Sequence, residues 1–135
     1  MKLAPRMNTI GLLLMVIVSI LTVSVAEADT NAQKVVALYM QSLFAGDVEA
    51  LESCLGENLR ERRSAVLDDP TYANVLISRY DNATYRFLQS QSRKNGTTTV
   101  DVEITFKSTE KLTIRFLVNQ RYEIIDEIII CVIVF

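Results

Sequence analysis

The spacing of apolar residues changes near residue 83, and this change limits the fold of the chain more than any other feature. Up to that point, apolar residues recur every three or four positions, as on the buried face of a helix. Beyond it they alternate with polar residues, as on a strand with one buried face. The sequence therefore predicts an α+β domain, with two to three N-terminal helices packed on an antiparallel sheet of three to four strands.

Glycine and proline divide the helical half into segments. Gly46 can end the first helix in the left-handed conformation, and Asp47 can accept the free amide protons that start the next one. Gly56 ends the second helix, and Pro70 suits the first turn of a later helix because no amide proton is needed there. Helices are expected over residues 32–44, 48–55 and 71–80, and residues 57–67 are compatible with a helix.

The second half carries the signals of strands and tight turns. Lys94-Asn95-Gly96 is typical of a turn between two antiparallel strands. In the segment that follows, from residue 100 to residue 107, every second side chain is apolar, which predicts one dry and one wet face. Before the turn, Tyr85, Phe87 and Gln89 are expected to share a face. Further strands are expected over residues 112–118 and from Arg121 toward Phe135.

The N-terminal segment has the layout of a cleavable signal peptide. Lys2 and Arg6 precede an apolar run over residues 10–23, and the small residues Ala26 and Ala28 follow at the positions that a signal peptidase reads. The alternative is an uncleaved anchor, because this stretch is close to the shortest that spans a bilayer. Residues 1–28 are thus predicted to be a signal peptide and residues 29–135 one exported domain, periplasmic or secreted, which meets a membrane only if the leader stays attached.

The charge balance argues against a nucleic-acid partner. The chain has 14 basic and 16 acidic residues, and loss of the leader removes two basic residues and one acidic residue, which leaves a net charge of about −3. Nucleic-acid binding depends on clustered positive charge. The one basic cluster, Arg60, Arg62 and Arg63, is interleaved with Glu61. It is interpreted as a solvated helix face, and the alternative is a patch for an anion or a partner.

The chain contains no histidine. This excludes catalytic triads that use histidine and the ordinary zinc sites that include it. Any catalysis would rest on carboxylate, tyrosine, lysine or thiol groups, and no metal or cofactor is expected.

The order of elements and two short stretches resemble the nuclear transport factor 2-like superfamily, also called the cystatin-like cone. Residues 39–51, YMQSLFAGDVEAL, are similar to its first helix, Gly-Asp break and second helix. Residues 116–126, FLVNQRYEIID, are similar to its closing hairpin, with Tyr122 where an aromatic residue is usual. The resemblance implies a strongly curved sheet wrapped against a long helix, which leaves a conical pocket. Members include isomerases, dehydratases, small-ligand binders and protein-binding modules, so the fold does not determine the function.

Asp126 is the sharpest catalytic candidate. In a last strand without a bulge, it shares a face with Tyr122, Ile124 and Ile128, which would place a carboxylate on an apolar surface. Burial there would raise its pKa and make it a usable general acid or base, with a tyrosine such as Tyr39 donating to a substrate oxygen. The alternative is that Asp126 lies at a bulge or rim and faces water.

Aromatic side chains are the candidates for the walls of the pocket, because an aromatic body with a polar tip suits such walls. Packing in the core is the alternative for each tyrosine. The expected lining residues are Tyr39, Tyr72, Tyr85, Phe87, Phe116 and Tyr122.

Cys54 and Cys131 are the only cysteines. An exported compartment permits a disulfide between them, which would join the second helix to the last strand. Separate buried thiols are the alternative, since nothing in the sequence indicates that this helix reaches that strand.

Eight consecutive apolar residues, Ile128 to Phe135, end the chain as given. A run this apolar needs cover on both faces. It is expected to be either a central strand under the helices or a strand that meets another subunit, for example in a homodimer formed through the sheet.

Three functions follow from these features. The first is an exported domain without catalytic activity that binds a small apolar ligand or a protein partner. The second is a small isomerase or lyase that uses Asp126 and a tyrosine. The third is an accessory subunit that docks through its apolar C-terminal strand.

Overall fold

The computed structural model describes residues 30–135. The predicted signal peptide, residues 1–28, lies outside the described residues and stays a prediction. Within residues 30–135, no helix combines the length and the apolar character needed to cross a membrane.

Helices form the first half of the described chain. A helix covers residues 30–45 and is called the N-terminal helix below. Gly46 follows with a positive φ of 67°, and the Asp47 side chain accepts a hydrogen bond from the Ala50 amide, as predicted for a stop followed by a cap. The helix-compatible segment over residues 57–67 is broken at Arg63. The shorter helices are α2 (Val48–Ser53), α3 (Glu57–Arg62), α4 (Ser64–Leu67) and α5 (Tyr72–Arg79).

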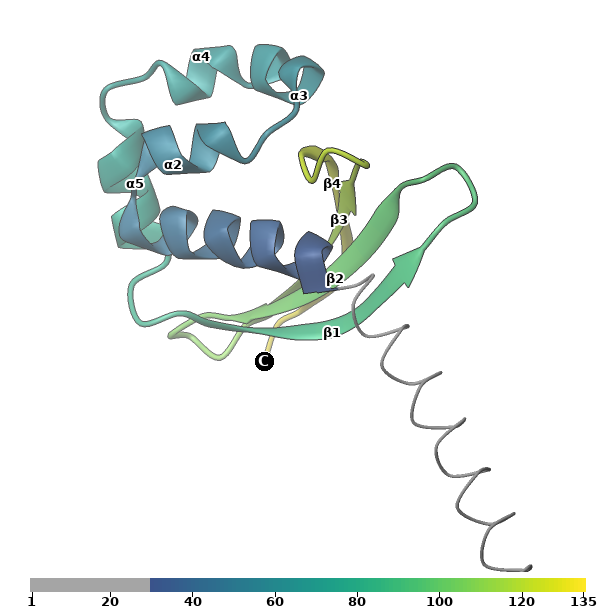
Figure 1. The fold of residues 1–135 in the computed structure, drawn as a ribbon. Coiled ribbons are helices and arrows are strands. Elements are labelled where there is room, and N and C mark those ends of the chain that lie inside the picture. Colours follow the sequence, from purple (N-terminus) through teal and green to yellow (C-terminus); the bar gives the residue numbers. More distant parts are fainter. Residues whose placement is uncertain (1–29) are drawn as a thin grey trace, which may run out of the picture.

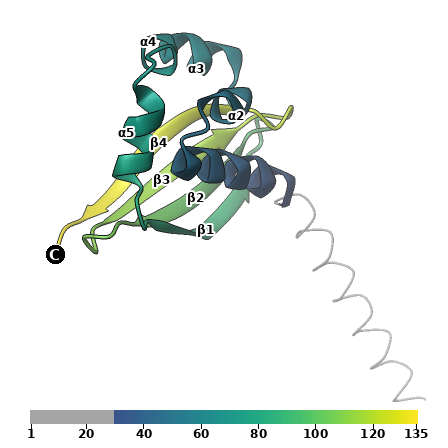
Figure 2. The ribbon, with the colours of Figure 1, turned by 90° about the vertical axis from the view of Figure 1, so that its left-hand side faces the viewer.

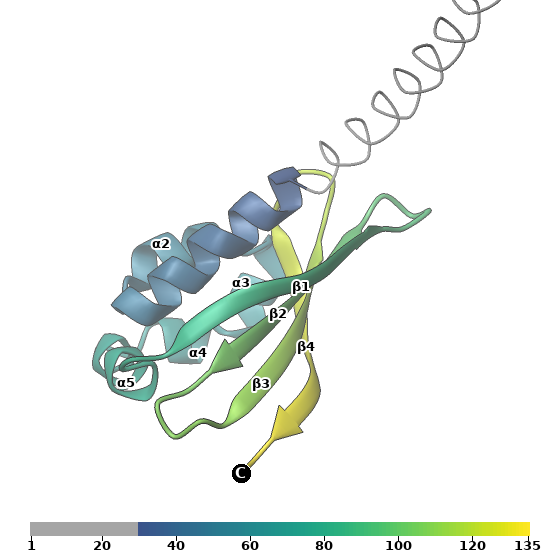
Figure 3. The same cartoon turned by 90° about the horizontal axis from the view of Figure 1, so that it is seen from below.

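Four strands form the second half, in one antiparallel sheet with the order β1-β2-β3-β4. They are β1 (Thr84–Ser92), β2 (Thr98–Thr105), β3 (Lys111–Val118) and β4 (Ile124–Ile133). The helices lie on one side of the sheet (Figures 1 and 2), and Figure 3 shows the twist of the strands beneath them. The predicted α+β architecture, with helices packed on an open antiparallel sheet, is confirmed.

The hydrophobic core lies between the N-terminal helix and the helix-facing side of the sheet. Phe116 of β3 is fully buried at its centre, and its ring meets the Tyr39 ring edge-on at a centroid distance of 5.4 Å. The surrounding residues come from the helix face and from alternate positions of the strands: Val36, Met40, Leu43, Val100, Val102, Ile104, Ile114 and Val118.

The opposite face of the sheet is polar and carries ordered ion pairs. Arg115 donates to Asp101 at 2.8 Å, and Arg86 donates to Glu103 at the same distance. The hydrogen bonds from Arg115 hold the pKa of the buried Asp101 carboxyl below its ordinary value. This is the wet face that the alternation in residues 100–107 predicts.

Register shifts interrupt the pairing of both outer strands. In β1 the shift lies between Phe87 and Gln89, so that Gln89 is opposite Asp101 and donates to its carboxylate at 3.1 Å. The prediction that Gln89 shares a face with Tyr85 and Phe87 is therefore wrong. In β4 the shifts lie opposite the steps Leu117/Val118 and Thr113/Ile114 of β3. After each shift, the residues that follow project from the face opposite to the one that strict alternation predicts.

The apolar C-terminal run lies in β4 and beyond it, at the edge of the sheet. In the described chain, β4 pairs with β3 on one side and no strand is paired on its other side. The alternative of a central strand under the helices is wrong, because the residues from Ile128 onward are exposed. The alternative of a strand that meets another subunit stays a prediction.

Truncation of Phe116 tests the position of the core. Phe116→Ala should lower the free energy of unfolding by about 3–5 kcal/mol, because a buried ring is lost and a cavity remains. Leu88→Ala, at an exposed position of β1, is the matched control and should change it little. Urea denaturation of both variants would measure this, and equal losses would contradict the assignment.

Candidate functional site

A pocket of about 300 Å³ lies between the helices and the sheet. The N-terminal helix, the α3–α4 junction, α5 and the strands β3 and β4 all contribute to its walls. Its lining combines aliphatic side chains, three tyrosines, two arginines and one carboxylate: Tyr39, Leu43, Arg63, Val66, Tyr72, Val75, Leu76, Arg79, Tyr80, Ile114 and Glu127.

The carboxylate in this pocket is Glu127, and the prediction that Asp126 occupies it is wrong. Val118 pairs with Ile124 but Leu117 pairs with Asp126, so Ile125 is an extra residue in β4. Glu127 is therefore opposite the buried Phe116, and residues directly opposite each other project from the same face. Asp126 projects from the other face, where its side chain is 45% exposed and 3.6 Å from Arg62. The bulge that the sequence left as the alternative is present.

Arg63 holds Glu127 in an ion pair that contacts both carboxylate oxygens. Its Nη1 lies 3.0 Å from Oε1 of Glu127 and its Nη2 lies 2.9 Å from Oε2. The same Nη1 donates to the Tyr39 hydroxyl at 3.1 Å. With 31% of the Arg63 side chain and 16% of the Glu127 side chain exposed, the pair is largely removed from water. This makes it stronger than the Arg86–Glu103 pair on the outer face, in which 68% of the arginine side chain is exposed.

The pKa shifts follow from this geometry. Burial, together with the nearby negative charge of Glu127, raises the pKa of Tyr39 well above its ordinary value. The hydrogen bonds to Glu127 raise the pKa of the Arg63 guanidinium. Burial also raises the pKa of Tyr72 and of Tyr80. At neutral pH the three tyrosines are thus uncharged, and they offer hydroxyl groups to a ligand without carrying charge.

The loop before α3 is joined to β4 by backbone hydrogen bonds. The Gly56 amide donates to the Ile124 carbonyl at 2.8 Å, and the Ile124 amide donates to the Cys54 carbonyl at 2.8 Å. These bonds and the Arg63–Glu127 pair attach the α3–α4 segment to β4 at two points. The segment is thereby positioned as a wall of the pocket.

The other predicted lining residues lie in different places. Tyr39 and Tyr72 line the pocket, whereas Phe116 packs beneath Tyr39 in the core. Tyr85 and Phe87 belong to a ring cluster with Phe44, Tyr80 and Phe106, with centroid distances of 5.2–5.9 Å.

Tyr122 is not a lining residue, and its prediction is corrected. It sits in the turn before β4 with a positive φ of 59° and an exposed side chain. Its hydroxyl accepts a 3.4 Å hydrogen bond from Asn31. Because Tyr122 lies in the turn and not in β4, its side chain does not project from the same face of the sheet as Ile124.

The two cysteines are free thiols, which contradicts a disulfide between them. Cys54 is buried beside Ile124 at the start of β4. Cys131 is exposed seven residues further along that strand, a separation of about 20 Å at the usual rise per residue. A disulfide needs Cα atoms within about 7 Å. Burial raises the pKa of the Cys54 thiol, which makes it less reactive.

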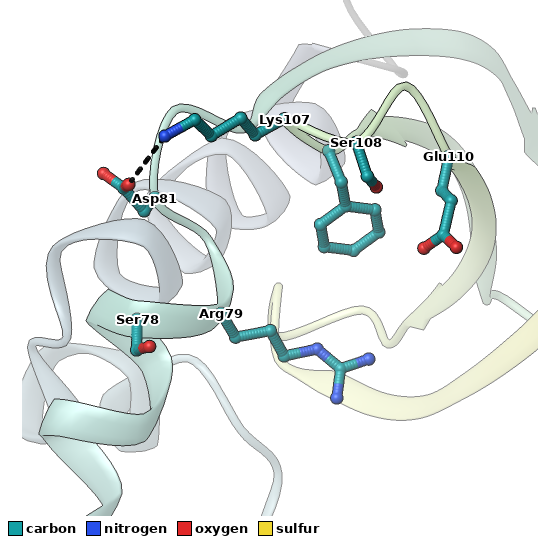
Figure 4. A pocket seen from close by; sticks show the side chains of 7 residues that line it. Ser78, Arg79, Asp81, Lys107, Ser108 and Glu110 are labelled. Carbon is teal, nitrogen blue, oxygen red and sulfur yellow. Dashed lines mark ion pairs between the residues drawn. The ribbon is translucent and has the colours of Figure 1, made fainter.

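A second hollow, of about 560 Å³, lies between the end of α5 and the turn from β2 to β3 (Figure 4). Arg79 and Glu110 reach toward it from opposite sides, and Lys107 forms a 3.9 Å ion pair with Asp81 at its rim. Its lining combines positive and negative side chains that are exposed to solvent. This combination indicates no particular ligand or reaction for the hollow.

Sequence reasoning missed Arg63 and Glu127. Arg63 was grouped with the solvated face of a helix, yet it lies four residues after Leu59 and four before Leu67, both of which are buried. This spacing puts all three on one helical face and was a signal available in the sequence. Glu127 faces the pocket because Ile125 is an extra residue in β4. In the sequence, this bulge is indicated only by the two adjacent isoleucines at positions 124 and 125.

Comparison with known proteins gives no match: no protein-family model fits the sequence, and no curated protein or solved structure matches it. The resemblance to the nuclear transport factor 2-like superfamily therefore stays a prediction.

Removal of Arg63 tests the ion pair. Arg63→Met should lower the free energy of unfolding by about 1–3 kcal/mol, because the largely buried Glu127 loses its partner. The double variant Arg63→Met with Glu127→Leu should regain much of that loss, since two apolar groups replace the pair. Arg86→Met removes an exposed arginine that also bonds a carboxylate at 2.8 Å and should have little effect. Additive losses in the double variant, measured by urea denaturation, would contradict the coupling.

The raised pKa of Tyr39 predicts a loss of stability in alkali. Above about pH 10 a tyrosine in the unfolded chain loses its proton, while the folded protein keeps Tyr39 neutral. The unfolded state then binds fewer protons, so the free energy of unfolding falls as the pH rises further. Tyr39→Phe should flatten this slope, with a remainder from Tyr72 and Tyr80. Stability curves from pH 8 to about pH 11 would measure it, and an unchanged slope would contradict the assignment.

Proposed function

We propose that this chain is an exported, nuclear transport factor 2-like domain that binds a small, largely apolar ligand in the Tyr39 pocket without transforming it. The Tyr39 pocket is the 300 Å³ pocket bounded by the N-terminal helix, α5 and the sheet. One observation carries the proposal: among the described residues that line the pocket, the single carboxylate is held by Arg63 through both of its oxygens.

A carboxylate in this state is a poor general base. A base must accept a proton from the substrate, and both oxygens of Glu127 are already in contact with a guanidinium that stays charged, one of them through a hydrogen bond. The isomerase alternative relied on Asp126 in the pocket, and Asp126 projects from the opposite face. The polar groups of the pocket therefore suit binding and orientation better than proton transfer.

The size and the walls of the pocket support a small ligand. About 300 Å³ is at the lower end of the range for small-molecule sites, roughly 300–1,000 Å³. Leu43, Leu76 and Ile114 supply apolar surface, and the tyrosine hydroxyls supply hydrogen-bond partners. A compact molecule with an apolar body and one uncharged polar group matches this combination.

Blocking the pocket from its rim tests the proposal. Val75 lines the pocket and is 54% exposed, so Val75→Trp can fill the entrance without straining the core. The control is Ile77→Trp, two residues further along α5, at a position that is 50% exposed and is not among the lining residues. The probe is the uncharged fluorophore N-phenyl-1-naphthylamine, titrated into protein purified from an exporting host.

Val75→Trp should weaken binding of the probe at least about tenfold, and Ile77→Trp should leave it within about twofold, with both variants folded by circular dichroism. Native mass spectrometry of the wild-type protein should show a copurified small molecule that Val75→Trp lacks. Equal binding by both variants, or turnover of a bound molecule that requires Glu127, would contradict the proposal.

A further inference from the structure

The exposed edge of the sheet carries seven of the thirteen large apolar side chains that are exposed in the described chain. We call residues 128–135 the apolar edge. Seven of its eight side chains are large and apolar, with exposed fractions between 40% and 83%, and the eighth is the exposed Cys131. Ile128 to Ile133 belong to β4, whose outer backbone groups are paired, among residues 30–135, only at Ile124, with the loop before α3. An uncharged edge strand with open backbone groups is a template for another strand.

We propose that a second copy of this chain pairs its own apolar edge antiparallel to this one, so that a single sheet continues across a two-fold axis. The proposal is independent of the ligand in the Tyr39 pocket. It assigns the apolar edge as an interface and a second copy as its occupant.

Three properties favour a second copy. The apolar edge has no charged residue, so two identical segments can face each other without repulsion. Antiparallel pairing of identical strands generates a closed two-fold contact, which is the commonest symmetry of soluble oligomers. Its seven large apolar side chains are 40–83% exposed, so pairing can bury apolar area on each copy toward the roughly 800 Å² per partner of a stable interface.

The composition of the sheet indicates that pairing occurs through its edge and not through its face. The face away from the helices carries Arg86, Glu103 and Lys111, joined by ion pairs of 2.8 and 3.7 Å. Stacking two copies of this face would remove these charges from water at high cost. Edge pairing leaves them solvated and satisfies the backbone groups of β4.

The symmetry also predicts which residues meet. A two-fold axis perpendicular to the sheet places like residues opposite each other near the axis, and it keeps each side chain on its own face. Residues that face each other in an antiparallel pair project from the same face, so the axis passes through a residue position, and Cys131 and Val132 are the two positions nearest the midpoint of the apolar edge. The Cys131 side chains of the two copies should therefore lie close together on the same face, within reach of a short crosslinker.

Mass measurement and native crosslinking test the interface in the wild-type protein. Size-exclusion chromatography with light scattering should give the mass of a dimer at micromolar concentration. A short bismaleimide should join the two copies through Cys131, and Cys131→Ser should abolish the crosslink. Cys54 serves as the internal control, because it is buried and should not react in the folded protein.

Charge placed in the apolar edge should separate the copies. Ile129 and Val132 are strongly exposed, so the double variant Ile129→Lys with Val132→Lys should keep the monomer fold and lose the dimer. Leu88→Lys, at an exposed position on the opposite edge strand, should stay dimeric. A monomeric wild-type protein would overturn the proposal. So would a dimer that survives the double lysine variant, or a complex in which a different chain occupies β4.

Discussion

The ion pair between Arg63 and Glu127 joins parts of the molecule that are distant in sequence. Arg63 lies at the junction of α3 and α4, and it donates hydrogen bonds to Glu127 in the last strand and to Tyr39 in the N-terminal helix. Three residues before Glu127, the backbone of Ile124 binds the loop that precedes α3. The α3–α4 segment is thus attached to β4 at two points, and its residues Arg63 and Val66 form part of the wall of the Tyr39 pocket.

The sequence predicted the fold well where side-chain periodicity is regular. In β2, the alternation from Val100 to Ile104 identified both faces, because every inward position is aliphatic and every outward one is polar or charged. It failed where a strand contains an extra residue, since one insertion exchanges the faces of everything after it. Strict alternation along β4 places Asp126 on the pocket side, whereas the bulge places Glu127 there. Ile125 packs near Gly56 instead of continuing the alternation.

Charge patterning was a weak guide to the site for a related reason. Three arginines near one another usually mark a solvated surface, and Arg60 and Arg62 are indeed exposed. Arg63 differs because it follows Leu59 by one helical turn and so shares the buried side of the segment. Only the position of Glu127, which depends on the register of β4, explains why an arginine is stable there. Predicting the Arg63–Glu127 pair therefore requires both the helix periodicity around Arg63 and the register of β4.

The two edges of the sheet differ, and the difference determines how far it can extend. Both edge strands contain bulges, but β4 ends in uncharged residues, whereas β1 carries the exposed charge of Arg86. A charged edge strand is a poor partner for addition. If two copies join through β4, both free ends of the shared sheet are β1 strands. The shared sheet is then finite, because neither of its free edges is the uncharged strand through which the copies join.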